Sequence, residues 1–183
     1  IWYNLIIGVN SSHMDTHFIS SLQETLKKAL NLLEELPTNL YNDNSIGPFY
    51  SSVGGHIRHI LDFYTSVFNG LDSNSIDLTD RERDCLIEID INYAKSKIRR
   101  VLDDLEEFTT YKLDARYELI DDLGQGTVNI PTNLYAILVQ ANSHTIHHYA
   151  IISHLLYAYD IVIKDQTFGY NPTTPVKKVL VNR

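Results

Sequence analysis

The sequence is poor in the residues that build disulfide frameworks and cysteine-based metal sites. Among its 183 residues are one methionine and one cysteine, Cys85. A single cysteine excludes an intramolecular disulfide and any zinc motif that needs two cysteines. A lone free thiol is typical of a reducing compartment, so we expect a cytoplasmic protein. We interpret Cys85 as a partly buried small apolar residue, because no histidine lies near it in sequence to activate it as a nucleophile.

Basic charge and long apolar runs are also scarce. Lysine and arginine number 15 against 23 acidic residues, which gives a net charge of -8. The basic footprint of a nucleic-acid-binding protein is therefore missing, and anionic membrane surfaces are disfavoured. No run reaches the roughly 18 apolar residues of a membrane-spanning helix. The hydrophobic content of 44% and the length instead fit one globular domain with a core of its own.

The beginning of the chain differs from the rest in composition. Its first seven residues are mostly apolar but too few for a signal peptide, and they lack a basic leader. The tripeptide Ser12-His13-Met14 is typical of a vector junction. We therefore expect residues 1–13 to be a vector-derived or disordered leader, and residues 14–183 to form a single domain.

Helical periodicity covers most of that domain. Apolar residues recur at steps of three and four in four segments, which predicts four amphipathic helices. Pro37 ends the first helix, Gly70 ends the second, and the residues after Pro37 are typical of a loop. Four such segments with short connections predict an all-α four-helix bundle. The expected helices are residues 14–36, 50–69, 85–108 and 131–160.

A stretch of strand-forming residues interrupts the helical pattern before the last helix. Residues 111–120 are rich in strand formers, residues 121–126 contain two glycines and two aspartates, and a second short apolar run follows. This order predicts a small β-hairpin inserted before the last helix. We expect Pro131 to lie in the first turn of that helix or just ahead of it.

Two histidines of the last helix lie four residues apart on its apolar face. His144 and His148 continue a stripe formed by Ile137, Ala141 and Ile151. Residues at this spacing are neighbours on one helix face, about 5–6 Å apart at Cβ, so both imidazoles can reach one ion. Two buried polar rings need partners, and a metal ion satisfies both together. The other interpretation is a pair of core histidines held by ordinary hydrogen bonds.

A third ligand would come from the second helix, where His56 and His59 are both candidates. His147 points about 100° away from His148 around the last helix, which makes it a hydrogen-bonding or surface residue. Three neutral histidines with open coordination positions are typical of catalytic sites, since structural zinc sites are usually closed by four protein ligands.

These residues resemble the motifs of the DinB/YfiT-like superfamily of metal-binding four-helix bundles. The resemblance rests on the run Gly55 to Tyr64, with its two histidines, and on His-Thr-Ile-His-His from His144 to His148. It spans about residues 14–159. It implies His59 as the ligand from the second helix, with His144 and His148 from the last. His56 matches a position that is often histidine but is usually not the ligand.

The same resemblance implies a divalent zinc, nickel, iron or manganese ion with water at its open positions. Members of the superfamily include thiol-dependent transferases and isomerases and metal-binding domains of larger enzymes, and many have no assigned activity. We therefore expect a metal-dependent hydrolase or thiol-dependent transferase that acts on a small molecule, with a low-molecular-weight thiol as a candidate co-substrate. A bound metal ion would lower the pKa of water or of a thiol, or polarise a carbonyl group.

A proton-transfer group would be needed beside the metal. Asp62 and His147 are the catalytic candidates, although Asp62 could instead orient an imidazole from behind or be a solvated helix residue. Arg81, Arg83 and Glu88 could line the pocket mouth, but a solvated charge run is the better interpretation of them.

Two other classes of function fit the same sequence. One is a non-catalytic metal-binding or stress-related bundle, which a carboxylate closing the fourth coordination position would favour. The other is a metal-free module for partner binding or dimerisation, with Tyr149, Tyr157 and Tyr159 as interface residues. An open coordination position with a connected cleft would favour the enzyme. We expect a homodimer in any of these cases.

Overall fold

The computed structural model describes residues 11–175 and is mostly helical, with a small three-stranded sheet. Residues 1–10 of the expected leader lie outside this range, and the first helix begins at Ser11, before Met14. The elements in chain order are α1 (Ser11–Glu35), α2 (Thr38–Tyr41), α3 (Val53–Asn69), β1 (Ser75–Asp77), α4 (Cys85–Ile89), α5 (Ile91–Glu107), the 3-10 turn η1 (Phe108–Thr110), β2 (Arg116–Asp122), β3 (Thr127–Asn133) and α6 (Leu134–Ala158).

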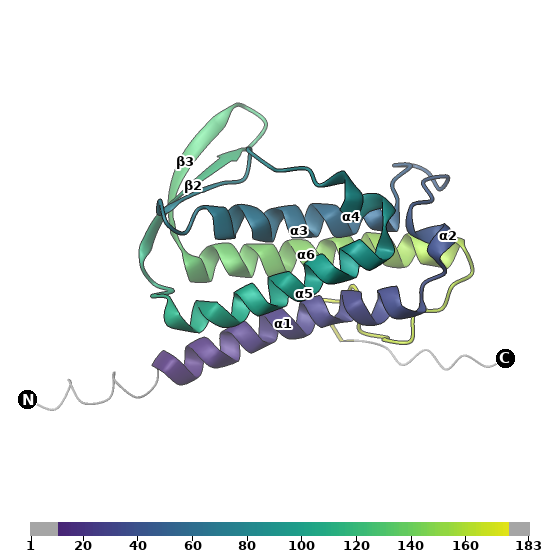
Figure 1. Ribbon diagram of the computed structural model, residues 1–183, viewed down its shortest axis with the longest axis horizontal. Helices are drawn as coiled ribbons and strands as arrows, with labels where there is room; N and C mark the ends of the chain where they lie inside the picture. The colour runs from purple at the N-terminus through teal and green to yellow at the C-terminus, as the bar shows by residue number, and fades with distance from the viewer. Residues whose placement is uncertain (1–10, 176–183) are drawn as a thin grey trace, which may run out of the picture.

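Four long helices make up the body of the molecule. Helices α1 and α6 have 25 residues each, and α3 and α5 have 17 each. Helix α3 packs against α6, and α1 packs against α5, with the members of each pair running in opposite directions (Figure 1). Each helix turns an apolar face inward, as its periodicity predicts. Fully buried side chains between the helices include Leu26, Leu33, Ile57, Leu61, Ile98, Leu105 and Leu134.

The prediction of a single third helix over residues 85–108 is wrong. Residues 85–107 form two helices that meet at Asp90, where the backbone is extended (φ -117°, ψ 105°). The Asp90 carboxylate accepts hydrogen bonds from the backbone N–H groups of Asn92 and Tyr93, so it caps a new helix rather than continuing the old one. The apolar periodicity runs across this break, and it therefore hides the change of direction.

The short helix α4 lies against the beginning of α3, and Gly54 makes this contact close. A Cβ atom on Gly54 would lie 2.1 Å from the backbone oxygen of Glu88, a distance that no side chain tolerates. The absence of a side chain at Gly54 therefore lets α4 approach α3 and brings Glu88 to the histidine-bearing face of α3.

The predicted hairpin is confirmed and has a third strand that the sequence did not indicate. Strands β2 and β3 pair antiparallel, and β1 pairs parallel with β2 on its other side. The hairpin rises from the end of the body at which α6 begins and stands above α3 (Figure 1). Pro131 lies in the edge strand β3 opposite Glu118, where a missing N–H is tolerated, and not in a helix. Helix α6 begins three residues later, at Leu134, capped by the side chain of Asn133.

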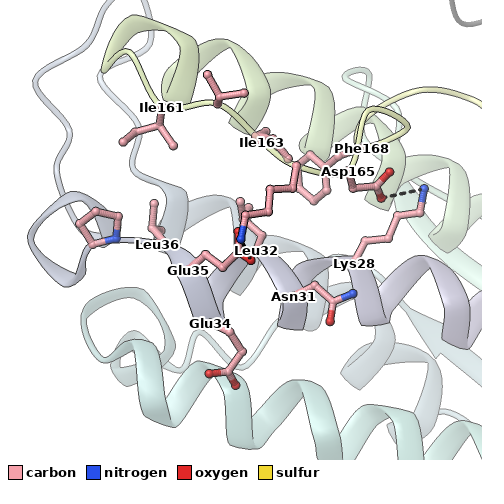
Figure 2. A pocket seen from close by; sticks show the side chains of 13 residues that line it. Lys28, Asn31, Leu32, Glu34, Glu35, Leu36, Ile161, Ile163, Asp165 and Phe168 are labelled. Carbon is pink, nitrogen blue, oxygen red and sulfur yellow. Dashed lines mark hydrogen bonds and ion pairs between the residues drawn. The ribbon is translucent and has the colours of Figure 1, made fainter. Parts of the chain in front are cut away.

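The chain after α6 folds back along α1. Phe168 is buried and stacks on Tyr149 of α6, with ring centroids 4.4 Å apart. A cavity of about 490 Å³ lies between the returning chain and the end of α1, bordered by Leu36, Ile163 and the ion pair of Lys28 with Asp165 (Figure 2). Among the described residues, no helix is long and apolar enough to cross a membrane.

Candidate metal centre

Three histidines from two helices meet at the centre of the α3–α6 interface. One ring nitrogen each of His59, His144 and His148 lies within 4.8 Å of the others. The ring centroid of His59 lies 4.9 Å from that of His144 and 4.7 Å from that of His148, and the centroids of His144 and His148 are 4.5 Å apart. In residues 11–175, no other group of three histidine, cysteine or acidic side chains is close enough to hold a metal ion together.

The surroundings of the three rings keep them neutral. His148 is buried with 8% of its surface exposed, and His59 and His144 are partly buried. Burial lowers the pKa of His148 to about 3 and that of His59 to about 4, and the neighbouring imidazoles add to both shifts. Burial also lowers the pKa of His144, with a further contribution from the charge of Arg81. Since a metal ion binds only the neutral imidazole, all three rings are in the binding form at neutral pH.

A series of hydrogen bonds contacts His148 on the side of its ring that faces away from the cluster. His148 Nε2 lies 3.1 Å from His144 Nε2, and His148 Nδ1 lies 2.9 Å from His56 Nδ1. His56 Nε2 in turn lies 2.8 Å from Ser51 Oγ. A His148 ring that turned its Nε2 lone pair to a metal ion would carry its proton on Nδ1 and donate to His56, which would then donate to Ser51. This arrangement suits a metal ligand, whose second ring nitrogen usually donates to a polar neighbour.

His56 therefore lies beside the cluster, not in it. The nitrogens that converge are those of His59 and the two α6 histidines, while His56 reaches the far nitrogen of His148. The sequence predicts both α3 histidines near the site. The hydrogen bonds from Ser51 through His56 to His148 show that His59 belongs to the cluster and that His56 contacts it from outside. No pattern in the sequence pointed to Ser51, because it precedes the helix in a loop.

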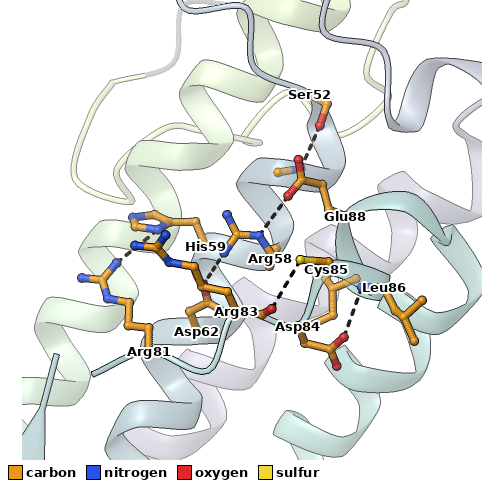
Figure 3. Close-up of polar contacts among 12 residues, drawn as sticks. Ser52, Arg58, His59, Asp62, Arg81, Arg83, Asp84, Cys85, Leu86 and Glu88 are labelled. Carbon is orange, nitrogen blue, oxygen red and sulfur yellow. Dashed lines mark hydrogen bonds and ion pairs between the residues drawn. The ribbon is translucent and has the colours of Figure 1, made fainter. Parts of the chain in front are cut away.

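Arginine and acidic side chains surround His59 on α3 and on the chain before α4 (Figure 3). Arg58 donates from Nε to Glu88 at 3.0 Å and from one Nη to Asp62 at 2.6 Å. Arg81 donates from Nη1 to His59 Nδ1 at 3.2 Å. The interpretation of Arg81 and Glu88 as parts of a solvated charge run is therefore wrong. The i, i+4 spacing of Arg58 and Asp62 could have revealed their pair from sequence, whereas Arg81 lies in a loop whose path no pattern predicts.

The two catalytic candidates lie in different surroundings. Asp62 is buried with 4% of its surface exposed and is held by Arg58. Burial raises the pKa of its carboxyl group, and the charge of Arg58 opposes that shift. His147 is exposed, with its ring centroid 5.3 Å from that of His148. Cys85, expected to be partly buried, is exposed, and its thiol lies 3.5 Å from the backbone oxygen of Arg83.

A cavity of about 410 Å³ opens beside the histidines. Its walls come from the beginning of α3, from α4, from the loop before α3 and from His148 of α6. His59 and His148 of the cluster line it and His144 does not, and His56, Arg58 and Glu88 lie in the same walls. The cavity beside α1 is larger, but it contains no histidine and lies away from the cluster. We regard the smaller cavity as the candidate substrate site, because it alone of these two joins open space to a group of convergent, neutral ligands.

A model of the DinB superfamily matches residues 21–152, more than half of the chain. The chain belongs to the DinB superfamily. The matched region runs from α1 into α6 and contains all three histidines of the cluster. Searches of curated proteins and of solved structures returned no match for this DinB protein.

The residues present fit the metal ion that the DinB superfamily implies. The converging donors are three imidazole nitrogens, which suit zinc, nickel and iron ions. No carboxylate of the described residues joins this group of ligand atoms, and the carboxylates of Asp62 and Glu88 are paired with Arg58. A bound ion would keep coordination positions for water or substrate, as in catalytic rather than structural zinc sites.

Proposed function

We propose that this DinB protein is a metal-dependent enzyme that acts on a small molecule, as a hydrolase or as a thiol-dependent transferase. In this proposal the four long helices form a four-helix bundle, and His59, His144 and His148 hold one zinc, nickel, iron or manganese ion at its centre. The observation that carries the proposal is the convergence of three neutral imidazoles beside a cavity, with no free carboxylate to close the site.

The bound ion would lower the pKa of a water molecule or thiol, or polarise a carbonyl group. Residues of the protein would orient the metal ligands and transfer protons. His56 and Ser51 fix the orientation of His148 through the hydrogen bonds described above. The exposed ring of His147 lies close enough to the cluster to move a proton between substrate and solvent. Asp62 acts less directly, by positioning Arg58 at the wall of the cavity.

The metal-free interface module has less support. Tyr149, one of the three tyrosines proposed for it, is buried with 1% of its surface exposed and cannot contact a partner. Tyr157 is 81% exposed and Tyr159 is partly buried, so only one of the three tyrosines is fully available to a partner. The homodimer and the cytoplasmic location stay predictions from the sequence.

Two reactions test the proposal. Protein loaded with zinc, nickel, iron or manganese would be assayed for hydrolysis of p-nitrophenyl acetate and for transfer of cysteine or glutathione to an electrophilic aromatic chloride. We expect one of the two activities to require metal and to be lost in His148→Ala. The matched control is His154→Ala, which removes an exposed histidine of the same helix outside the cluster. Metal-loaded protein with no activity in either assay above the His148→Ala background would favour the non-catalytic metal-binding bundle instead.

A further inference from the structure

Two arginines near the histidine cluster have no acidic partner. Of the arginines in residues 11–175, four form ion pairs with carboxylates, while Arg81 and Arg83 form none. The contrast is informative because the chain carries 23 acidic residues and a net charge of -8. The paired arginines are Arg58, Arg99, Arg100 and Arg116.

The loop between β1 and α4 carries both unpaired arginines to the side of α3 that holds the cluster. Arg81 is partly buried and fixed at two points, because its Nε donates to the backbone oxygen of Leu78 at 2.7 Å while Nη1 reaches His59. Arg83 is exposed, and its charge acts on the Asp62 carboxyl group. Both guanidinium groups point toward the face of α3 that carries His59 and Asp62 (Figure 3).

The contact between Arg81 and His59 is incompatible with metal binding by His59. A neutral imidazole has one lone pair and one N–H, and arginine can only donate. Arg81 therefore uses the lone pair on Nδ1, which leaves the proton on Nε2. Whichever nitrogen of His59 binds the ion, the hydrogen bond from Arg81 has to break. A bound ion thus frees the Arg81 guanidinium a few ångströms from the metal.

The charge balance around the site then calls for an anion. Arg58 already holds the carboxylates of Asp62 and Glu88. Glu82 and Asp84 flank Arg83 in the loop, but neither forms an ion pair with it or with Arg81, and Asp84 pairs with Lys97 instead. The three ligands are neutral, so they would not compensate the charge of a divalent ion. Unpaired guanidinium groups bind carboxylate and phosphate oxygens through charge-assisted hydrogen bonds.

We propose that Arg81 and Arg83 form an oxyanion-binding site beside the three-histidine centre, which takes the carboxylate or phosphate group of the substrate once Arg81 has left His59. This inference rests on the proposed function and deepens it, because it assigns an anionic substrate to the same centre. Metal and anion binding are coupled in this site, since the ion releases the arginine that the anion needs.

The test compares Arg81→Gln, Arg83→Gln and the matched control Arg99→Gln with the wild-type protein. Arg99 is exposed and paired with Glu34 on the opposite side of the body. Zinc affinity would be measured by competition with a chromogenic chelator. Binding of inorganic phosphate and of acetate would be measured by NMR titration of the backbone amides of residues 78–84, with and without zinc. Circular dichroism would confirm that each variant is folded.

We expect Arg81→Gln to bind zinc about tenfold more tightly, because a competing donor and a like charge are removed. It should bind oxyanions about tenfold more weakly in the zinc form. Arg83→Gln should weaken oxyanion binding by a similar factor with a smaller change in zinc affinity, and Arg99→Gln should change neither. Whichever of phosphate and acetate binds more tightly to the zinc form identifies the anionic group of the substrate.

Two results would overturn the inference while leaving the proposed function intact. One is oxyanion affinity that is equal in the wild type and in both site variants, and the other is weaker zinc binding by Arg81→Gln. A wild-type protein that takes up no metal would instead overturn the proposed function. In that case Arg81 stays on His59, and the inference falls together with the proposed function.

Discussion

The two antiparallel helix pairs of this protein, α3–α6 and α1–α5, have different interiors. The α1–α5 pair meets through apolar side chains, such as Leu26 and Leu105, and keeps its charges outside, where Glu34 pairs with Lys95 and Arg99. The buried polar residues of the described chain lie instead on α3, at its N-cap or on α6. They are Ser52, Asp62, Ser66, Thr145 and His148.

The contrast lies in the polar groups of the two interfaces and not in their apolar area. Ile57 and Leu61 of α3 and Leu134 of α6 are as deeply buried as Leu26 and Leu105. Burial of apolar surface is favourable, whereas burial of an imidazole or a carboxyl group costs free energy unless a partner satisfies it. The α3–α6 interface therefore carries a cost that the α1–α5 interface does not.

The largest change in stability is expected in the apolar pair. Leu105 of α5 has no exposed surface, so Leu105→Ala should lower the free energy of unfolding by about 2–5 kcal/mol. Urea denaturation measures the loss, and Leu86→Ala, at a leucine that is 53% exposed, is the control, with an expected change within about 0.5 kcal/mol. The amount of metal bound per folded molecule should not change. A loss of metal binding in folded Leu105→Ala would show that the two helix pairs are not separable.

A smaller loss is expected where α4 touches the polar pair. Gly54→Ala places a Cβ atom against the backbone oxygen of Glu88, and such overpacking costs about 1–3 kcal/mol. Gly55→Ala is the matched control, because its Cβ atom would come no closer than 3.3 Å to the Ser52 hydroxyl group and 3.7 Å to the Glu88 carboxylate. Thermal unfolding of both variants distinguishes them. Equal stability of the two would contradict the close packing of α4 on α3.

A pH dependence of stability is expected in the polar pair alone. The pKa values of His59 and His148 are lowered in the folded state to about 4 and about 3, from an ordinary value near 6.5. Below pH 6.5 the unfolded chain therefore binds protons that the folded chain does not. The stability of metal-free protein should be complete above pH 6.5 and fall as the pH drops toward 4, by up to about 1.4 kcal/mol per pH unit for each histidine.

Urea denaturation of the metal-free protein between pH 7 and pH 5.5 measures this slope. His148→Leu should flatten the slope, since it removes the group whose pKa falls to about 3, although His56 and His144, whose pKa values are also lowered, keep part of it. Leu86→Ala should leave the slope unchanged. A slope in His148→Leu as steep as that of the wild type would assign the pH dependence to other groups.

Regular spacing explains why much of the site could be predicted from sequence. The four-residue separation of His144 and His148, inside an apolar stripe, fixes both on one face of α6 whatever surrounds that helix. The two histidines of α3 were equally visible, but the choice between them was not. Which of them joins the cluster depends on the rotation of α3 against α6, and that is set by packing along both helices.

Loops and helix junctions account for what the sequence did not reveal. Arg81 reaches His59 because β1 pairs with β2 and directs the following loop across α3, and a three-residue strand has no period of its own to recognise. The break at Asp90 was missed for the opposite reason, since the apolar period continues through it. Pro131 was expected in the first turn of α6 or just ahead of it, and it lies ahead, in the edge strand β3. Proline starts helices but is equally tolerated in an edge strand, so its presence did not decide between the two places.

The most direct test of the three-histidine metal site is the metal content of the protein, purified without chelator or nickel resin and measured by elemental mass spectrometry. The site predicts about one equivalent of a transition metal in the wild type and in His154→Ala, and none in folded His148→Ala. Wild-type protein that is metal-free and cannot be loaded with zinc, nickel, iron or manganese would contradict it, and the three histidines would then be polar core residues that serve no ion.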